Sequence, residues 1–296
     1  MSFLEKLQAE TPTLSFEFYP PKDSEGWGTL YAALGNISKR APDYVTVTYG
    51  AGGSTRQKTV ELVSRIQDEL GIEAMAHLTC VGHSKAEIAS ILDALQGAGV
   101  RAVMALRGDP PQGEAAFEAH PDGFAHASDL IGFIKSHWDF CIGCSFYPEK
   151  HLEAESLAHD IGFLKLKQDQ GADFAVSQIF FDNPTFYEFR ARAQDAGVTI
   201  PLVAGIMPVT SLDQLGAKGI LQRAGTVIPK SLTDALGAGT RSEIVERGVH
   251  FAVAQCRDLL QNGTAGIHFY TLNRSTSSLR VTEALRAQRY FPLPRK

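Results

Sequence analysis

The stretch LSFEFY, Leu14–Tyr19, alternates apolar and polar side chains over most of its length. This period of two is typical of a β-strand, in which successive side chains point to opposite faces. Phe16 and Phe18 therefore share one face, and Ser15 and Glu17 share the other. Because a bulky apolar face suits packing against helices, we expect Glu17 to point away from them, into the interior of the fold.

Seven further β-type runs follow along the chain, and longer amphipathic stretches separate them. The runs lie at Tyr44–Tyr49, Glu73–Thr79, Ala102–Arg107, Cys141–Tyr147, Phe174–Phe180, Pro201–Ile206 and Gly266–Tyr270. Helices are expected at Thr55–Leu70, Ser84–Ala98 and Glu153–Gln170, with one or two more between Ser231 and Leu260. Eight β/α units without a long linker predict an α/β fold, a (β/α)8 TIM barrel, as a single domain over residues 1–296.

The composition argues against several classes of partner. Lysine and arginine total 28 against 33 aspartates and glutamates, a formal net charge of −5, so there is no basic footprint for nucleic acid or an anionic membrane. The first twelve residues lack the apolar core of a signal peptide, and no apolar run approaches the ~20 residues of a membrane span. We therefore expect a cytoplasmic protein.

Cys141 and Cys144 form a C-x-x-C, a spacing found in redox and zinc sites. We favour a structural interpretation, because an i, i+3 pair on a strand points to opposite faces. The sequence holds no second C-x-x-C to complete a zinc site. No metal site is therefore expected.

Polar side chains gather at the ends of the predicted strands. They are Glu17, Thr48, His77, Arg107, Asp109, Tyr147, Gln178 and Tyr270. Barrel active sites lie at the C-terminal ends of the strands, so these side chains are expected to share one rim. Any one of them has a structural interpretation as a satisfied buried polar residue, but their convergence favours a site for a polar organic ligand. Two carboxylates alone would suggest glycoside hydrolysis, whereas the surrounding groups are typical of hydrogen bonding to a heteroaromatic ring.

The segment Gly-Ala-Gly-Gly-Ser-Thr at residues 50–55 follows a predicted strand and nearly matches the dinucleotide fingerprint G-x-G-x-x-G. Its last glycine is missing, and eight β/α units fit a barrel better than a doubly wound sheet. A dinucleotide-fold dehydrogenase is therefore the least favoured interpretation. The glycines are better explained by a tight turn close to a bound ligand.

Ordered motifs along nearly the whole chain resemble those of the methylenetetrahydrofolate reductase family. They are SFEFYPPK (Ser15–Lys22), VTVTYGAGG (Val45–Gly53), HLTC (His77–Cys80), ALRGDPP (Ala105–Pro111), YPEKH (Tyr147–His151), QIFFD (Gln178–Asp182), AGIMP (Ala204–Pro208) and HFYTLNR (His268–Arg274). The resemblance implies a barrel that binds FAD non-covalently. It also implies ping-pong reduction of 5,10-methylenetetrahydrofolate to 5-methyltetrahydrofolate, with NADH or NADPH as electron donor, and a homo-oligomer.

The resemblance also implies roles by position. Glu17 matches the general acid that protonates N10 of the folate, and Asp109 matches the aspartate beside the flavin and the pterin. Gln178 matches the pterin-binding glutamine, while Tyr270 and Arg274 match residues on the substrate side. The implied FAD contacts are Thr48, His77, Arg107, Gly108, Asp109, Ala127, Tyr147, His151, Asp160 and Lys167.

Asp160 and Lys167 lie seven residues apart in a predicted helix and hence on one face. There the carboxylate suits the ribose hydroxyls and the ammonium suits the pyrophosphate, although a solvated helix face is the default without the motifs. Three positions depart from the family pattern: His126, Phe163 and Leu166 replace residues that often contact the flavin nucleotide.

Two alternatives follow. One is a flavin-independent relative with direct hydride transfer from NADH, and the other is a non-catalytic pterin-binding barrel, against which Glu17 argues. The chain also ends soon after the barrel, so the additional regulatory domain of eukaryotic members is not expected.

Overall fold

Eight parallel strands close into a barrel in the order of the sequence, and β8 pairs back with β1. The computed structural model describes residues 3–21, 23–48, 56–109, 117–216 and 219–292. The strands are β1 Thr13–Phe18, β2 Tyr44–Val47, β3 Ala74–Thr79, β4 Ala102–Leu106, β5 Cys141–Phe146, β6 Phe174–Ser177, β7 Leu202–Ile206 and β8 Gly266–Tyr270. The predicted (β/α)8 fold is confirmed.

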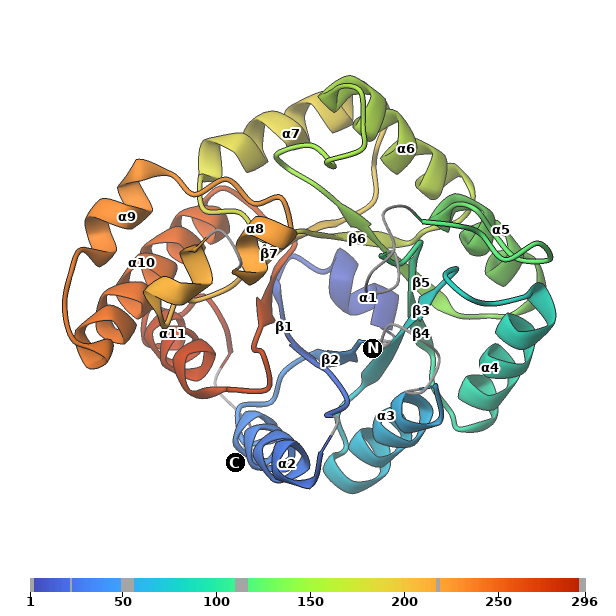
Figure 1. Cartoon of the computed structure of the whole chain (residues 1–296), viewed down its shortest axis with the longest axis horizontal. Helices are drawn as coiled ribbons and strands as arrows, with labels where there is room; N and C mark the ends of the chain where they lie inside the picture. Colours follow the sequence, from blue (N-terminus) through green and yellow to red (C-terminus); the bar gives the residue numbers. More distant parts are fainter. Residues whose placement is uncertain (1–2, 22, 49–55, 110–116, 217–218, 293–296) are drawn as a thin grey trace.

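Helices surround the barrel in a ring (Figure 1). They are α1 Phe3–Gln8, α2 Ser24–Ser38, α3 Arg56–Leu70, α4 Lys85–Gly97, α5 Ala127–His137, α6 Leu157–Asp169, α7 Asn183–Asp195, the 3-10 helix η1 Leu212–Leu215, α8 Ile220–Arg223, α9 Lys230–Leu236, α10 Arg241–Gln261 and α11 Thr276–Ala287. The region expected to hold one or two helices before the last strand holds α9 and α10. Helix α1 lies inside the ring, at its centre in Figure 1.

Side-chain caps decide where several helices begin. Ser84 caps α4 in a reciprocal capping box with Glu87. Helix α6 was expected from Glu153, and this prediction is wrong by four residues. Ser156 is its N-cap and accepts a hydrogen bond of 3.1 Å from the backbone N–H of His159, so the helix begins at Leu157.

The core has two layers that follow the strand alternation. Phe16 and Phe18 of β1 pack in the outer layer between strands and helices. A smaller inner layer fills the N-terminal end of the barrel, where Phe3 of α1 contacts Tyr44 and Phe174, with ring centroids 4.7 and 5.7 Å apart. The prediction that the apolar face of β1 packs against helices is therefore confirmed, and the C-terminal end is left for polar side chains.

The C-x-x-C pair divides between these layers. Cys144 belongs to the outer cluster, and Cys141 packs against the inner one. Both are free thiols. Within the described ranges, no group of three or more histidine, cysteine, aspartate or glutamate side chains is placed to hold a metal ion.

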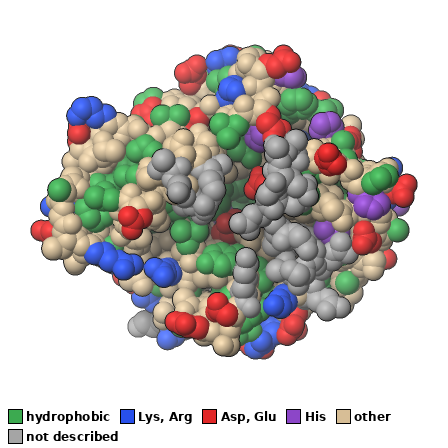
Figure 2. All heavy atoms as spheres, viewed as in Figure 1, with side chains coloured by type: hydrophobic (Ala, Val, Ile, Leu, Met, Phe, Trp, Pro, Cys, Tyr) green, Lys and Arg blue, Asp and Glu red, His purple; other side chains and the backbone are tan. Residues whose placement is uncertain are grey.

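The charged surface mixes both signs. Figure 2 shows acidic and basic side chains interspersed around the periphery of the face seen in Figure 1. No helix among the described residues is both long enough and apolar enough to cross a membrane.

Several strands end before the predicted residue, and two of these differences affect expected site residues. β4 ends at Leu106, and Arg107, which was expected on its inward face, lies one residue beyond it. The alternation would in fact place Arg107 with Ala105, which packs in the outer cluster. β6 ends at Ser177 rather than at Phe180, and Phe180 also packs in the outer cluster. The period-two rule fails at Phe180 because it applies only while the chain remains extended, whereas at Arg107 the rule itself indicates the outer face and the expectation of an inward side chain is wrong.

Candidate active site

Glu17 lies near the C-terminal end of β1, between two histidines. Its Oε2 is 3.7 Å from Nε2 of His77 on β3 and 3.8 Å from Nε2 of His268 on β8. In the strand register Glu17 stands opposite Thr46 of β2 and Tyr270 of β8. Its side chain is 19% exposed, so the carboxyl group is sheltered but open to a ligand entering the mouth.

Three buried polar atoms on β2 and β3 have no hydrogen-bond partner in the described part of the chain: Nε2 of His77, Oγ1 of Thr46 and Oγ1 of Thr79. Burial lowers the pKa of His77 to about 4, although Glu17 acts in the opposite direction. His77 is therefore neutral at pH 7. Because buried polar atoms normally have partners, this set fits a ligand that brings its own hydrogen-bonding atoms into the mouth.

His268 is a site residue that the strand-end pattern misses, because it lies two residues before the end of β8. It is buried, and its Nδ1 shares a hydrogen bond of 2.9 Å with Oγ of Ser15. Nδ1 is thereby fixed on Ser15 and Nε2 is directed toward Glu17. The available signal was the i, i+2 spacing of His268 from Tyr270, which places both on the inward face.

Side chains continue the contact between β1 and β8 beyond the last paired residues. The side-chain amide of Asn273 donates to the backbone oxygen of Tyr19 at 2.8 Å and accepts from its N–H at 3.0 Å. Oγ1 of Thr271 donates to the backbone oxygen of Glu17 at 2.6 Å. Leu272 and Asn273 have φ values of 49° and 58°, a left-handed turn that brings the amide back to β1. The backbone of Glu17 is thus held from the β8 side.

Tyr270 packs beside β7 near the mouth. Its hydroxyl donates to the backbone oxygen of Ser177 at 2.8 Å, and its ring meets His268 edge-on at 5.1 Å. This position requires a glycine at 205, where an added Cβ would lie 2.6 Å from Cε2 of Tyr270. Burial first, and Glu17 second, raise the pKa of Tyr270 well above its ordinary value, so its hydroxyl stays protonated.

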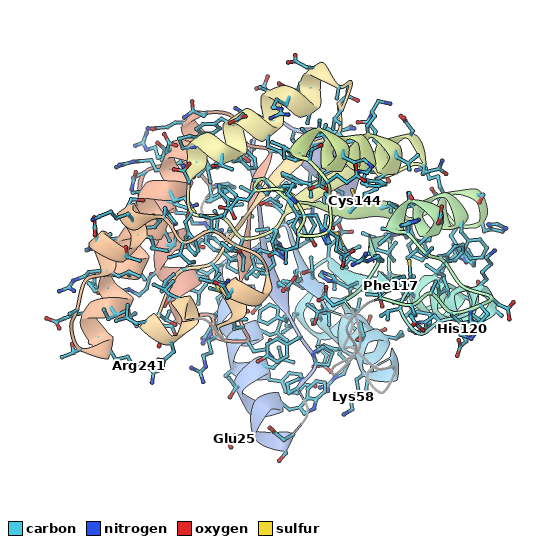
Figure 3. The ribbon with its side chains drawn as sticks, turned by 45° about the horizontal axis from the view of Figure 1, so that its top comes forward. Glu25, Lys58, Phe117, His120, Cys144 and Arg241 are labelled. Atoms are coloured by element: carbon cyan, nitrogen blue, oxygen red, sulfur yellow. The ribbon has the colours of Figure 1, made fainter. Side chains whose placement is uncertain are left out.

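Arg107 follows β4 at the rim and is already paired. Its Nη1 and Nη2 both donate to the carboxylate of Glu153, the latter at 3.0 Å. The guanidinium carbon lies 5.0 Å from the ring centre of Phe117, which is labelled in Figure 3. Gly108 has a φ of 89°, and an added Cβ there would come within 2.7 Å of a neighbouring side chain. Asp109 is exposed.

Two of the residues expected to contact the nucleotide, Asp160 and Lys167 of α6, form hydrogen bonds with backbone groups of β5 and of the loop after it. Oδ2 of Asp160 accepts from the N–H of His151 at 2.8 Å, and Nζ of Lys167 donates to the oxygen of Ser145 at 2.8 Å. The ring of Tyr147 meets His151 edge-on at 4.6 Å. Burial raises the pKa of Tyr147 to about 12 and lowers the pKa of His151. Asp160 and Lys167 both reach the end of β5 and the loop after it, as one helix face allows.

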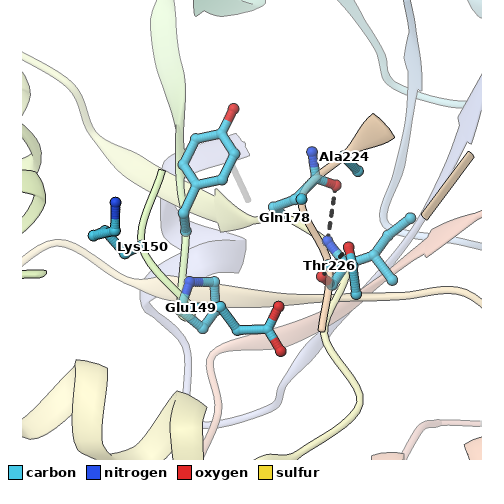
Figure 4. Close-up of a pocket in the computed structure, with 9 residues that line it drawn as sticks. Glu149, Lys150, Gln178, Ala224 and Thr226 are labelled. Carbon is cyan, nitrogen blue, oxygen red and sulfur yellow. Dashed lines mark hydrogen bonds between the residues drawn. The ribbon is translucent and has the colours of Figure 1, made fainter. Parts of the chain in front are cut away.

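Gln178 follows β6 and lines a small pocket (Figure 4). Its Oε1 accepts from the N–H of Ile179 at 2.8 Å, which fixes the orientation of the amide. Across the pocket, Glu149 accepts from the N–H of Val227 at 2.8 Å, and Oγ1 of Thr226 donates to the oxygen of Ile179 at 3.0 Å. The lining residues are Tyr147, Pro148, Glu149, Lys150, Gln178, Ile179, Ala224, Gly225 and Thr226.

Three more of the expected residues lie outside the strands. Arg274 is exposed on the loop after β8, Ala127 is the buried first residue of α5, and Thr48 directly follows β2. His126 is the N-cap of α5 and makes no side-chain cap hydrogen bond. The glycine-rich segment at residues 50–55 lies outside the described residues.

A sequence model of the family described as "Methylenetetrahydrofolate reductase" matches residues 2–286. The chain belongs to the methylenetetrahydrofolate reductase family. The resemblance in the strand-end motifs is thereby confirmed. The candidate site residues of this family member are Glu17 with His77 and His268, together with Gln178 and Arg107.

Curated members of the methylenetetrahydrofolate reductase family are similar in sequence. The 5,10-methylenetetrahydrofolate reductase of Escherichia coli (strain K12) is 36% identical over 277 residues, which cover 92% of this chain and 90% of the relative. "Methylenetetrahydrofolate reductase (NADH) 1" of Arabidopsis thaliana is 36% identical over 301 residues, which cover 95% of this chain and 50% of the relative. The chain thus spans about half the length of the plant relatives that it matches and most of the length of the bacterial ones.

Among solved structures, an uncharacterized protein from Clostridium thermocellum that binds two copies of 5-methyl-5,6,7,8-tetrahydrofolic acid aligns with a TM-score of 0.64. It is 14% identical, and the alignment covers 97% of this chain and 99% of that chain. At this identity the likeness shows the shared barrel fold alone.

Proposed function

We propose that this barrel reduces 5,10-methylenetetrahydrofolate to 5-methyltetrahydrofolate, with NADH or NADPH as electron donor. The observation that carries the proposal is the sheltered carboxyl of Glu17 between His77 and His268. A carboxyl is the group that an acid-assisted ring opening requires, and the unpartnered atoms of His77, Thr46 and Thr79 suit a heterocyclic ligand.

Glu17 is proposed as the general acid. Hydride can reach the one-carbon unit only after the five-membered ring of the folate opens to an iminium, and protonation of N10 makes this opening feasible. In the protonated form, Glu17 would give its proton to N10 and be left as a carboxylate. The hydrogen bond from Thr271 holds the backbone of Glu17, and the two histidines flank its carboxyl at 3.7 and 3.8 Å, which favours transfer in one geometry.

FAD is the proposed cofactor, and when bound it would take hydride from the nicotinamide and deliver it to the folate in a ping-pong cycle. The unpartnered polar atoms in the mouth and the positive φ of Gly108 fit a polar ring approaching the backbone closely. The residues proposed to hold FAD are Thr48, His77, Arg107, Gly108, Asp109, Ala127, Tyr147, His151, Asp160 and Lys167.

The folate is proposed to lie over Glu17, with its pterin at Gln178 and its far end toward Tyr270 and Arg274. The Gln178 amide is held by Ile179, so its NH2 group remains as a donor to a pterin. The exposed guanidinium of Arg274 suits the carboxylates of the folate tail. A cytoplasmic location and a homo-oligomer also remain predictions.

The absorption spectrum of the purified protein tests the flavin. We expect flavin bands, or their appearance after FAD is added and excess is removed by gel filtration. A colourless protein that takes up no FAD, yet oxidises NADH when methylenetetrahydrofolate is added, would instead support direct hydride transfer. The observation that favours this second candidate is the exposure of Phe163 and Leu166 on α6, two positions at which the resemblance in the motifs implies polar flavin contacts.

Asp109→Asn is expected to slow folate reduction on the order of tenfold. Negative charge beside the reacting rings would favour hydride release and stabilise the cationic iminium. Asp109 is exposed, so its loss should cost less than the roughly 10²–10³ of a preorganised group inside a closed site. Stopped-flow absorbance of each half-reaction measures the effect, and unchanged rates in both would remove Asp109 from the mechanism.

A further inference from the structure

The two terminal N–H groups of the Arg107 guanidinium already bind a carboxylate of the same chain, that of Glu153. Both terminal nitrogens of its guanidinium donate to the two carboxylate oxygens of Glu153, which lies in the loop between β5 and α6. The two residues are 46 positions apart, so this is a contact between two rim loops. Stacking on Phe117 holds the plane of the guanidinium on the other side.

The Glu153 partner is held loosely while Arg107 is not. The side chain of Glu153 is 55% exposed against 25% for Arg107. The backbone N–H of Glu153 donates to Nδ1 of His151 at 3.1 Å, which anchors the loop without holding the carboxylate. Glu153 can therefore rotate into water while its backbone stays in place.

Carboxylate and phosphate are interchangeable at such a fork. A guanidinium presents parallel N–H donors that match two oxygens of either group. The guanidinium of Arg107 stays charged when one anion replaces the other, so the replacement of carboxylate by phosphate requires no change in its protonation. Arg107 keeps the pKa of Glu153 below its ordinary range, so the carboxylate is ionised at neutral pH and repels any second anion.

We propose that Glu153 is a built-in anionic competitor, which the phosphate of an incoming dinucleotide displaces from Arg107. The identity of the phosphate rests on the proposed function, in which Arg107 and Lys167 are both among the residues that hold FAD. Glu153 thereby pairs with the guanidinium of Arg107 before the cofactor binds, and it lowers the affinity for the cofactor by the free energy needed to break this ion pair.

The size of this effect follows from exposure. Exposed ion pairs contribute little, so displacing Glu153 should reduce the affinity for FAD by about fivefold or less. We expect Glu153→Gln, which keeps the side-chain shape and removes the charge, to lower the Kd for FAD by about threefold. Quenching of flavin fluorescence in titrations of the apoprotein measures this Kd directly, without turnover.

Glu155→Gln is the matched control. Glu155 lies two residues away in the same loop, is 87% exposed and lies 3.8 Å from Nδ1 of His159. It removes the same charge from the same loop without freeing Arg107, so its Kd for FAD should stay within experimental error of the unmodified protein. In an Arg107→Gln background, the effect of Glu153→Gln should disappear.

Inorganic pyrophosphate supplies an independent probe. It should compete with FAD more strongly in the Glu153→Gln protein than in the unmodified one. If Glu153→Gln leaves the Kd unchanged or weakens FAD binding, the carboxylate positions Arg107 rather than competing for it, and the inference is overturned. If the unmodified protein binds no FAD at all, the proposed cofactor fails instead, which is a separate result.

Discussion

Glu17→Gln is expected to lose folate reduction by a factor of about 10²–10⁴ while reduction of bound flavin by NADH continues at nearly its native rate. The amide cannot deliver a proton to N10, but it keeps the shape of the carboxyl between His77 and His268. Stopped-flow absorbance separates the two half-reactions, because each changes the oxidation state of the flavin.

Glu25→Gln provides the comparison for this variant. Glu25 is an exposed glutamate in the first turn of α2 (labelled in Figure 3), so the same chemical change there should leave both half-reactions as they are. A Glu17→Gln protein that reduced folate at the native rate would show that the proton comes from another group. Loss of both half-reactions would point to a damaged site.

Gly205→Ala is expected to destabilise the fold by about 3 kcal/mol and to displace Tyr270. The added Cβ would lie 2.2 Å from the backbone oxygen of Ser177 and 2.6 Å from the Tyr270 ring, and it would come between the two partners of a hydrogen bond. Urea unfolding followed by circular dichroism measures the loss, and folate Kd in the folded protein reports the displaced ring.

Gly28→Ala tests whether the effect belongs to the position. Gly28 lies within α2, and an added Cβ there has nothing within 4 Å. The substitution should be neutral or stabilising by roughly 0.5–1 kcal/mol, because alanine loses less conformational freedom than glycine in a helix. Equal stability of the two alanine variants would mean that Tyr270 and Ser177 can shift to accommodate a side chain at 205.

The barrel could be predicted from the sequence because strand periodicity is a local property. Phe16 and Glu17 fall on opposite faces through backbone geometry alone, and this alternation repeats in each strand. An error arises where the backbone stops being extended. Gln178 follows the last strand residue, so counting by twos no longer says where its side chain points.

The site was less predictable because its contacts join distant parts of the chain. The Ser15–His268 hydrogen bond spans 253 positions, and nothing near either residue indicates the other. The ion pair between Glu153 and Arg107 could not be predicted either, because the two residues are 46 positions apart and Glu153 was expected inside a helix. A capping serine at 156 moves it into a loop, and that loop carries it to the rim.

The contacts that join β1 to β8 and to the residues after it determine when the site can form during protein synthesis. Thr271 and Asn273 reach the β1 backbone from 254 positions away, so the surroundings of Glu17 cannot form until the ribosome has made almost the whole chain. Such non-local pairing slows folding, because the ends must meet before their contacts compensate the lost entropy. A nascent chain therefore contains Glu17 long before its complete surroundings can form, and termination before β8 would leave Glu17 without His268 and Thr271.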